Sequence, residues 1–293
     1  MTEFKEQFGK YAEEFNVVLN SFCDKLGKCK PEILADSLIY SLKVGGKRVR
    51  PVIMYATADL LGLPREKVEN FALALELIHT YSLIHDDLPD MDDDDFRRGK
   101  PSNHKVFGSG NAILAGDGLL NTAYSVLLDE CRNGAEYVSA ASFICDCAGI
   151  NGMIAGQSAD LSHECDKNCT EEELMFIYEN KTAKLITAPL VVPAILSGSK
   201  HYSELKLLGY YLGCLFQLTD DILDVEGDFS SLGKSTRKDD EDGKCTAVSM
   251  YGIHKAKLHA DILTDRCLKI TESFEGDTSF IKNLIVYVRT RMN

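Results

Sequence analysis

The chain has 293 residues, 45% of them hydrophobic, which is enough to bury a large core, and no change in composition divides it. We therefore expect a single domain, residues 1–293. The formal net charge of −13 argues against nucleic acid as a partner, because binding a phosphate backbone requires a basic surface. An anionic substrate could bind only where Lys and Arg are concentrated locally.

Residues 1–8 lack the apolar stretch of a signal peptide. The longest apolar window, Leu185–Leu196, is too short to span a membrane and contains prolines. We therefore expect a cytosolic protein without a membrane span, whose ten cysteines are reduced thiols. The group His163–Cys169, with Cys145 and Cys147 upstream, lacks the spacing of a zinc ribbon or finger, and buried or loop thiols are the favoured interpretation.

Apolar residues recur every three to four positions along most of the chain, which predicts an all-α fold. The first predicted helices cover residues 4–22, 31–44, 52–61 and 68–87, and the last of these is apolar on nearly every side, as is typical of a central helix. Later helices are predicted at 106–127, 137–150, 151–162, 170–181, 184–189, 202–225 and over much of 245–293.

The segment Gly45-Gly46-Lys47-Arg48-Val49-Arg50-Pro51 separates the second and third predicted helices. The two glycines allow the backbone to approach an anion closely, and the next helix N-terminus adds its dipole. Lys47 and Arg50 flank this opening. The alternative is an ordinary helix corner with solvated cations.

Residues 79–105 carry seven carboxylates followed by the adjacent Arg97 and Arg98. Like charges this close repel, so we expect a cation among the aspartates Asp86, Asp87, Asp90 and Asp92, and Mg²⁺ suits such oxygen ligands. A solvated acidic loop is the alternative. An EF-hand calcium loop starting at Asp90 is excluded, because its sixth position is not Gly and its twelfth is not Glu.

Pro89 is expected to bend the chain, because a straight helix would turn Asp92 about 120° away from Asp86. Downstream, Thr170 and Glu173 form a capping box that starts a helix. The sequence Lys181-Thr182-Ala183-Lys184 then interrupts this helix, and a surface kink is one interpretation of it.

A second acidic cluster lies on the predicted helix 202–225. At 100° per residue, one stripe of this helix carries Gln217, Asp220, Asp221 and Asp224 among apolar neighbours. Because buried carboxylates need a partner, we expect this stripe to face the first cluster and its metal ions. The polar stretch 227–243 that follows is predicted to be a mobile lid, with Lys234 and Lys244 reaching toward the site.

These motifs, together with Gly156-Gln157-x2-Asp160-Leu161, resemble those of the trans-isoprenyl diphosphate synthases, the polyprenyl synthetase family, and most closely its bacterial-type farnesyl diphosphate synthases. The resemblance runs from about Lys43 to the C-terminal helices. It implies a single-domain bundle of about ten or more helices around a large central cavity, the isoprenoid synthase fold. It also implies a homodimer, for which no sequence pattern shows an interface.

The resemblance implies the following roles. Metal would be held by Asp86, Asp92 and Asp220, with Asp87 and Asp224 as further ligands, and Asp90 is left open. Isopentenyl diphosphate would contact Gly46, Lys47, Arg50, His79 and Arg98. The allylic diphosphate would contact Arg97, Lys181, Thr182, Gln217, Lys234 and Lys244. Asp86, Asp87, Asp92, Lys181, Asp220 and Asp221 would be the catalytic set, acting with about three Mg²⁺ ions that Mn²⁺ could replace.

The implied reaction is ionisation of dimethylallyl or geranyl diphosphate, attack by isopentenyl diphosphate, and loss of a proton. Tyr81, five residues before Asp86, implies a C15 product, whereas helix geometry puts Ser82 directly beneath Asp86. The alternatives are a geranylgeranyl diphosphate synthase, a terpene cyclase, which would not need the Gly-Gly-Lys segment, and a non-catalytic subunit on the same fold.

Overall fold

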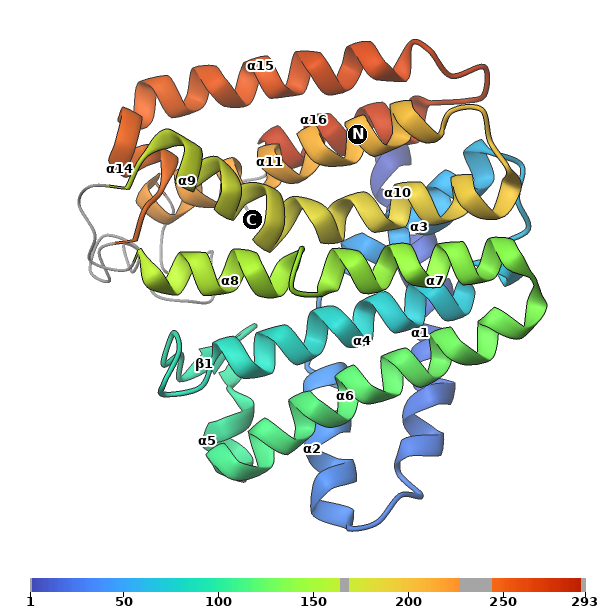
Figure 1. Ribbon diagram of the computed structural model, residues 1–293, viewed down its shortest axis with the longest axis vertical. Helices are drawn as coiled ribbons and strands as arrows, with labels where there is room; N and C mark the ends of the chain where they lie inside the picture. The colour runs from blue at the N-terminus through green and yellow to red at the C-terminus, as the bar shows by residue number, and fades with distance from the viewer. Residues whose placement is uncertain (1, 164–168, 227–243, 291–293) are drawn as a thin grey trace.

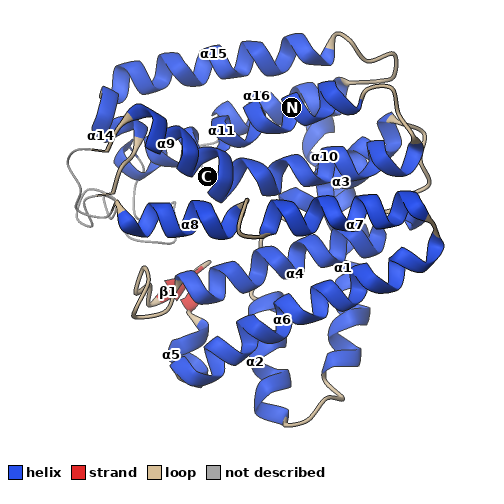
Figure 2. Cartoon of the chain, in the orientation of Figure 1, coloured by secondary structure: helices blue, strands red, loops and turns tan. Residues whose placement is uncertain are grey.

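The protein is almost wholly helical, as Figure 2 shows for the computed structural model. The structure describes residues 2–163, 169–226 and 244–290. The prediction of an all-α fold is confirmed. Within these residues the only strands are the antiparallel pair β1 (Phe96–Arg97) and β2 (Lys100–Pro101).

The first part of the chain contains α1 (Thr2–Leu26), α2 (Glu32–Lys43), α3 (Val49–Leu60), η1 (Arg65–Lys67), α4 (Glu69–Asp86), α5 (Asn103–Phe107), α6 (Ser109–Glu130), η2 (Cys131–Asn133) and α7 (Ala135–Ala148). The second contains α8 (Met153–Ser162), α9 (Glu171–Ile177), η3 (Tyr178–Ala183), α10 (Lys184–Ser197), α11 (Tyr202–Glu226), α14 (Ala247–Tyr251), α15 (Ile253–Thr271) and α16 (Ser279–Thr290). Many of these helices run side by side across the molecule (Figure 1).

Two apolar clusters form the interior. One surrounds α4, which packs against α1, α3, α6 and α10 and buries most of its side chains, as expected from its apolar sequence. The other surrounds α11, which packs against α10, α15 and η3. The two helices that carry the acidic clusters therefore belong to different halves of the core.

Two predicted boundaries are wrong for local reasons. The helix predicted at 106–127 is divided into α5 and α6 by Gly108, whose φ of +81° suits glycine. Helix α3 begins at Val49, three residues before the predicted start, directly after Arg48 in the left-handed region with φ 52°.

The interruption predicted at 181–184 is a π-helical turn, η3, between α9 and α10. The capping box of Thr170 and Glu173 is confirmed at the start of α9. The neighbouring backbones come very close to this turn. A Cβ on Gly213 of α11 would lie 2.3 Å from Ala183 Cα, and one on Gly156 of α8 would lie 2.1 Å from Lys181 N. Glycine at both positions therefore lets α8 and α11 close on the turn that carries Lys181.

Ala135–Ser162 is the one stretch within the described residues that is long and apolar enough to cross a membrane, judged by length and composition alone. By this criterion the longest apolar stretch is Ala135–Ser162, and the prediction that it is Leu185–Leu196 is wrong. In the structure the stretch consists of two helices, α7 and α8, and the 14 residues of α7 extend only about 21 Å, short of a hydrocarbon core of ~30 Å. It packs against α6, α10 and η3, and is weak evidence for a membrane span.

Cys169 and Cys245 form a disulfide bond, with their Cα atoms 6.2 Å apart. This corrects the expectation that all cysteines are reduced thiols. The pair is separated by 76 residues in the chain, so local spacing gave no indication of it. Seven further cysteines are free thiols within the described residues, and Cys165 lies outside them.

Substituting Gly213→Ala is expected to lower the free energy of unfolding by about 1–3 kcal/mol, because the added methyl group would overlap Ala183. Thermal and urea unfolding measure this change. Gly9→Ala in α1 is the matched control, since no heavy atom lies within 4 Å of the new Cβ, and it should be neutral or stabilising by up to about 1 kcal/mol. Equal stability of Gly213→Ala and the parent chain would contradict the tight packing.

Candidate active site

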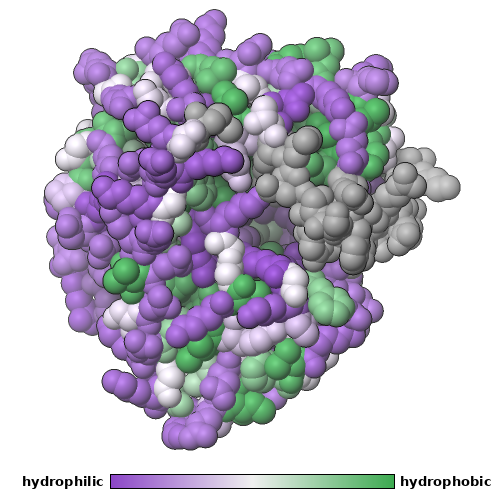
Figure 3. Space-filling model, turned by 180° about the vertical axis from the view of Figure 1, so that it is seen from behind, coloured by the Kyte–Doolittle hydropathy of each residue, from purple (hydrophilic) through white to green (hydrophobic). Residues whose placement is uncertain are grey.

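A cavity of about 560 Å³ lies between α4 and α11. Its polar lining comes from Arg50 of α3, His79, Ser82, His85 and Asp86 of α4, Asp117 of α6, Gln157 and Ser158 of α8, Lys181 and Thr182 of η3, and Gln217 and Asp220 of α11. Its apolar lining includes Tyr81, Met91, Leu120, Met153, Ile154, Leu161 and Phe216. The face of the molecule opposite to that in Figure 1 carries mostly hydrophilic side chains with scattered apolar ones (Figure 3). The lining of the cavity contains more apolar side chains than this outer face.

The first acidic cluster is shaped by the turn at the end of α4. The predicted bend at Pro89 is present, and Asp92 N donates a hydrogen bond of 2.8 Å to Asp86 O, which closes the turn. Burial in the cavity raises the pKa of Asp86 to about 7, and the nearby Lys181 opposes this shift while Asp92 adds to it. Asp86 is thus a largely desolvated carboxyl that Lys181 stabilises only in part. Asp90 is exposed.

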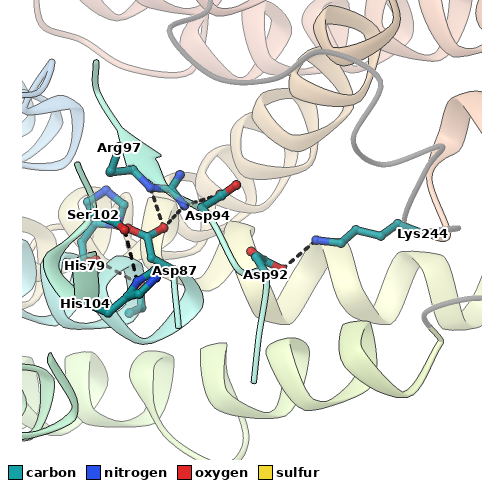
Figure 4. Close-up of polar contacts among 9 residues, drawn as sticks. His79, Asp87, Asp92, Asp94, Arg97, Ser102, His104 and Lys244 are labelled. Atoms are coloured by element: carbon teal, nitrogen blue, oxygen red, sulfur yellow. Dashed lines mark hydrogen bonds and ion pairs between the residues drawn. The ribbon is translucent and has the colours of Figure 1, made fainter. Parts of the chain in front are cut away.

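The other groups of this cluster are held by ion pairs (Figure 4). Arg97 bridges Asp87, which is only 2% exposed, and Asp94, from which its Nη2 is 3.0 Å away. Lys244 Nζ lies 2.8 Å from Asp92 Oδ1, so the segment before α14 reaches the first cluster. Asp87 and Arg97 do not line the cavity, and both border a smaller pocket beside it.

The second acidic cluster is divided between two environments. Asp220 and Gln217 line the cavity, whereas Asp221 and Asp224 are buried, 2% and 4% exposed, and do not line it. Asp221 accepts hydrogen bonds from Ala247 N at 2.9 Å, from Gln217 Nε2 at 3.0 Å and from the hydroxyl of Tyr178. The step of 100° per residue along α11 turns Asp221 toward the start of α14. Asp221 therefore ties α9–η3, α11 and α14 together.

A cationic corner, formed by Arg50 and Arg98, lies around His79 near the middle of α4. Arg50 is partly buried, and its buried Nε has no hydrogen-bond partner in the described part of the chain. Burial lowers the pKa of Arg50 to about 10, with Arg98 adding to the effect. Burial, and then the charges of Arg50 and Arg98, also hold the pKa of His79 well below its usual value. Such a cluster of cations favours an anion.

Glycine lets Arg98 occupy this corner. Gly46 has φ +137°, and a Cβ there would lie 2.6 Å from the Arg98 guanidinium, which donates a hydrogen bond to Gly45 O. Lys47 is exposed beside it and does not line the cavity. Gly45 and Gly46 thus make room for the side chain of Arg98, which lies 53 residues after Gly45 in the chain.

Arg48, for which the sequence suggested no role, anchors this corner. Its side chain is 4% exposed, and its Nη1 lies 2.7 Å from Glu76 Oε1 of α4. Its Nη2 and Nε donate hydrogen bonds to Leu42 O at 2.7 Å and to Asn16 Oδ1 at 3.2 Å. These three contacts of Arg48 join α1, α2, α3 and α4 next to Arg50 in the chain.

Lys181 is held at the cavity wall by an ion pair with Asp160 of α8. Burial alone would lower the pKa of Lys181, but Asp160 and then Asp86 outweigh it and raise the pKa, so the amine stays charged. Thr182 Oγ1 donates a hydrogen bond of 2.7 Å to Gln217 Oε1. Asp160 and Tyr178 are positioning residues that the sequence did not identify. The Gly156–Leu161 motif was the available signal for Asp160.

The apolar end of the cavity lies below Asp86. Tyr81 and Ser82 both line it, and Tyr81 is 6% exposed. The Tyr81 ring meets the His85 ring edge to face, with 5.8 Å between centroids. Leu120 of α6 and Met153 of α8 complete this wall. Lys234 lies outside the described residues, as does the predicted lid 227–243, so neither can be placed.

The chemistry of this site suits hard divalent cations. Carboxylates from α4 and α11 line one cavity, and burial raises the pKa of Asp86 although Lys181 is nearby. Within the described residues, three possible ligand atoms lie within 4.8 Å of one another only at Asp93–Asp95–His104 and at His163–Cys169–Glu173, both away from the cavity lining. Ions at the facing aspartates would thus need water or phosphate oxygens to complete their coordination, as Mg²⁺ prefers.

The fold and site define an all-α protein that is built to bind an anionic group beside an apolar chain. The polyprenyl synthetase family profile matches residues 31–283. The chain is 40% identical to farnesyl diphosphate synthase of Micrococcus luteus over 88% of this chain and 89% of the relative, and 38% identical to a chloroplastic geranylgeranyl pyrophosphate synthase of Capsicum annuum over 94% and 76%.

The geranyltransferase of Helicobacter pylori, solved in complex with magnesium and isoprenyl diphosphate, superposes with a TM-score of 0.81 at 28% identity, covering 96% of this chain and 94% of the other. The chain belongs to the polyprenyl synthetase family.

The raised pKa of Asp86 has a direct consequence for stability. A carboxyl whose pKa is higher in the folded than in the unfolded state destabilises the fold increasingly as pH rises toward and through about 7, and has no such effect below about pH 4. Asp86→Asn should therefore raise the melting temperature of the metal-free protein at pH 8. Allowing for solvent screening, we expect about 1 kcal/mol, or roughly 2–4 °C, and little difference at pH 4.

Thermal unfolding in a chelator at both pH values measures this effect, with Asp90→Asn at the exposed position as the matched control. A lower melting temperature for Asp86→Asn at pH 8, or a difference that does not change with pH, would contradict the assigned electrostatics.

Proposed function

We propose that the protein is a farnesyl diphosphate synthase, which joins isopentenyl diphosphate to dimethylallyl and then geranyl diphosphate. The observation that carries this proposal is one cavity that combines facing carboxylates, Asp86 and Asp220, with buried cations and an apolar end. Such a cavity can hold a diphosphate at one end and a growing hydrocarbon at the other. The relatives' names support the same chemistry.

We assign Mg²⁺ to the acidic clusters, about three ions as in the family resemblance, held by Asp86, Asp92 and Asp220 with help from Asp87 and Asp224. When bound, Mg²⁺ would supply charge stabilisation for the departing diphosphate. Asp87 and Asp221 also have structural partners, Arg97 and Ala247 N, so their contribution to catalysis includes keeping both walls in place.

The chain's own residues then act as clamps. Lys181 would bind the allylic diphosphate, oriented by Asp160, and Thr182, Gln217, Arg97, Lys234 and Lys244 would complete its site. Arg50, whose Nε has no partner among the described residues, would bind isopentenyl diphosphate with His79, Lys47 and Arg98. Their positive charge would stabilise the negative charge on the leaving group.

The carbon freed of its diphosphate would be an allylic cation among apolar walls. Phe216 and Tyr81 line this cavity, and aromatic faces attract cations. The apolar part of the lining would limit capture by water until the double bond of isopentenyl diphosphate attacks. The proton lost afterwards would go to the released diphosphate.

Assembly and location are further parts of this proposal. Leu114 and Leu128 are 56% and 68% exposed and lie on one stripe of α6, which supports a homodimer through this helix. We place the protein in the cytosol: seven free thiols in the described residues support a reducing compartment, in which the Cys169–Cys245 disulfide would be open to reduction.

Incubating the purified chain with labelled isopentenyl and dimethylallyl diphosphates tests the function. We expect C15 prenyl diphosphate with Mg²⁺ and no product with chelator. A C20 product would indicate a geranylgeranyl diphosphate synthase, and a hydrocarbon formed from farnesyl diphosphate alone would indicate a cyclase. No turnover by the chain on its own would favour a non-catalytic subunit.

Tyr81 is proposed to be the floor that ends chain growth at C15. Tyr81→Ala is expected to shift most of the product to C20 or longer while turnover stays within about tenfold, because the ring blocks space below Asp86. Product chromatography measures the shift, and Tyr81→Phe, which keeps the ring, should still give C15. Unchanged products from Tyr81→Ala would move the floor to another residue such as Ser82.

A further inference from the structure

Four side chains with metal-binding chemistry meet at the edge of the site, outside the catalytic cavity. His163 follows α8, Cys169 and Glu173 flank the start of α9, and Cys245 precedes α14. The ligand atoms of His163, Cys169 and Glu173 lie within 4.8 Å of one another, and Cys245 is bonded to Cys169. Cys, His and carboxylate are the donors that Zn²⁺ prefers.

The imidazole of His163 is oriented for a metal. Its Nδ1 lies 2.7 Å from Ala159 O, and because a carbonyl can only accept, Nδ1 carries the proton. In the neutral ring this leaves the lone pair on Nε2, which faces Glu173 Oε1 at 3.3 Å. A backbone carbonyl that fixes the tautomer in this way is the usual outer partner of a metal-binding histidine.

Glu173 is held in place independently of His163. Its Oε2 accepts hydrogen bonds of 2.8 Å from both the backbone N and the Oγ1 of Thr170 in the capping box. The remaining oxygen, Oε1, therefore stays turned toward His163. A lone pair and a carboxylate oxygen that face each other repel unless a proton or a cation lies between them.

We propose that the reduced protein binds one Zn²⁺ through Cys169, Cys245, His163 and Glu173, and that the disulfide is the metal-free, oxidised form of the same site. A dithiol reductant would break the S–S bond, giving two electrons and two protons to the sulfurs and becoming a disulfide itself. Zn²⁺ would then form two Zn–S bonds and release the two thiol protons. The four ligand atoms would settle roughly 3.4–3.8 Å apart, the edge of a tetrahedral site. His163, Cys169 and Glu173 already lie within 4.8 Å of one another, and the two sulfurs would move apart once their bond is reduced.

This four-residue site lies next to residues that contact both acidic clusters. Cys245 stands between Lys244, which pairs with Asp92, and Ala247, whose N–H binds Asp221. Cys169 stands at the start of the helix that leads into η3 and Lys181. Either the disulfide or the metal would join the start of α9 to the residues just before α14. Lys244 and Cys245 would therefore keep their position when the cysteines are reduced.

Co²⁺ serves as the spectroscopic probe. The full chain is reduced with a phosphine, freed of metal, and titrated with Co²⁺ in excess Mg²⁺, which occupies carboxylate sites. We expect a sulfur-to-cobalt charge-transfer band that saturates at one equivalent and disappears when Zn²⁺ is added. Carboxylate sites cannot give this band, so the result does not depend on the proposed enzymatic activity.

Cys169→Ser and Cys245→Ser should abolish the band, and His163→Ala should weaken Co²⁺ binding more than about tenfold, with circular dichroism confirming the fold of each variant. Cys29→Ser, which removes an exposed free thiol elsewhere, is the matched control and should bind like the parent chain. Absence of the band from the reduced parent chain, or its persistence in Cys169→Ser, would overturn the proposal.

Discussion

The structure depends on negative charge held inside an apolar cavity. Asp86 ends a helix that is buried on nearly every side, and its environment holds the pKa of its carboxyl at about 7 even with Lys181 nearby. Asp220 lines the same cavity from α11. A protein gains nothing in stability from this arrangement, because desolvated charges cost free energy unless they are paired. It becomes understandable once a ligand brings cations and phosphate to the site.

The surrounding architecture keeps those charges in position. Asp160 holds Lys181, Arg97 holds Asp87, and Asp221 joins α11 to the start of α14. The Asp160–Lys181 and Asp221–Ala247 contacts join separate helices, 21 and 26 residues apart, whereas Arg97–Asp87 spans ten residues and fixes the loop after α4. The site therefore depends on several elements and not on one loop. The π-helical turn and its close-packed glycines place Lys181 on the wall facing Asp86.

The sequence predicted most helices well, because periodicity reports which face of a helix is buried, and it indicated that Asp86 and Asp220 would lie at one cavity. Pro89 and the Thr170–Glu173 capping box act locally and were predicted correctly. The sequence alone could not assign residue pairs that form only through the tertiary structure. The disulfide, separated by 76 residues, and the Arg48–Glu76 anchor are of this kind. The stripe prediction for α11 was also incomplete, since Asp221 has a backbone partner that no local pattern indicates.

The central claim is that two distant acidic clusters grip the same ligand across one cavity. A crystal structure of the protein with diphosphate and Mn²⁺, with the ions located by anomalous scattering, tests it most directly. The account predicts ions on Asp86 and Asp92 on one side and on Asp220 on the other, all sharing oxygens of one diphosphate. Ions confined to one cluster, or a diphosphate bound away from Asp220, would contradict it.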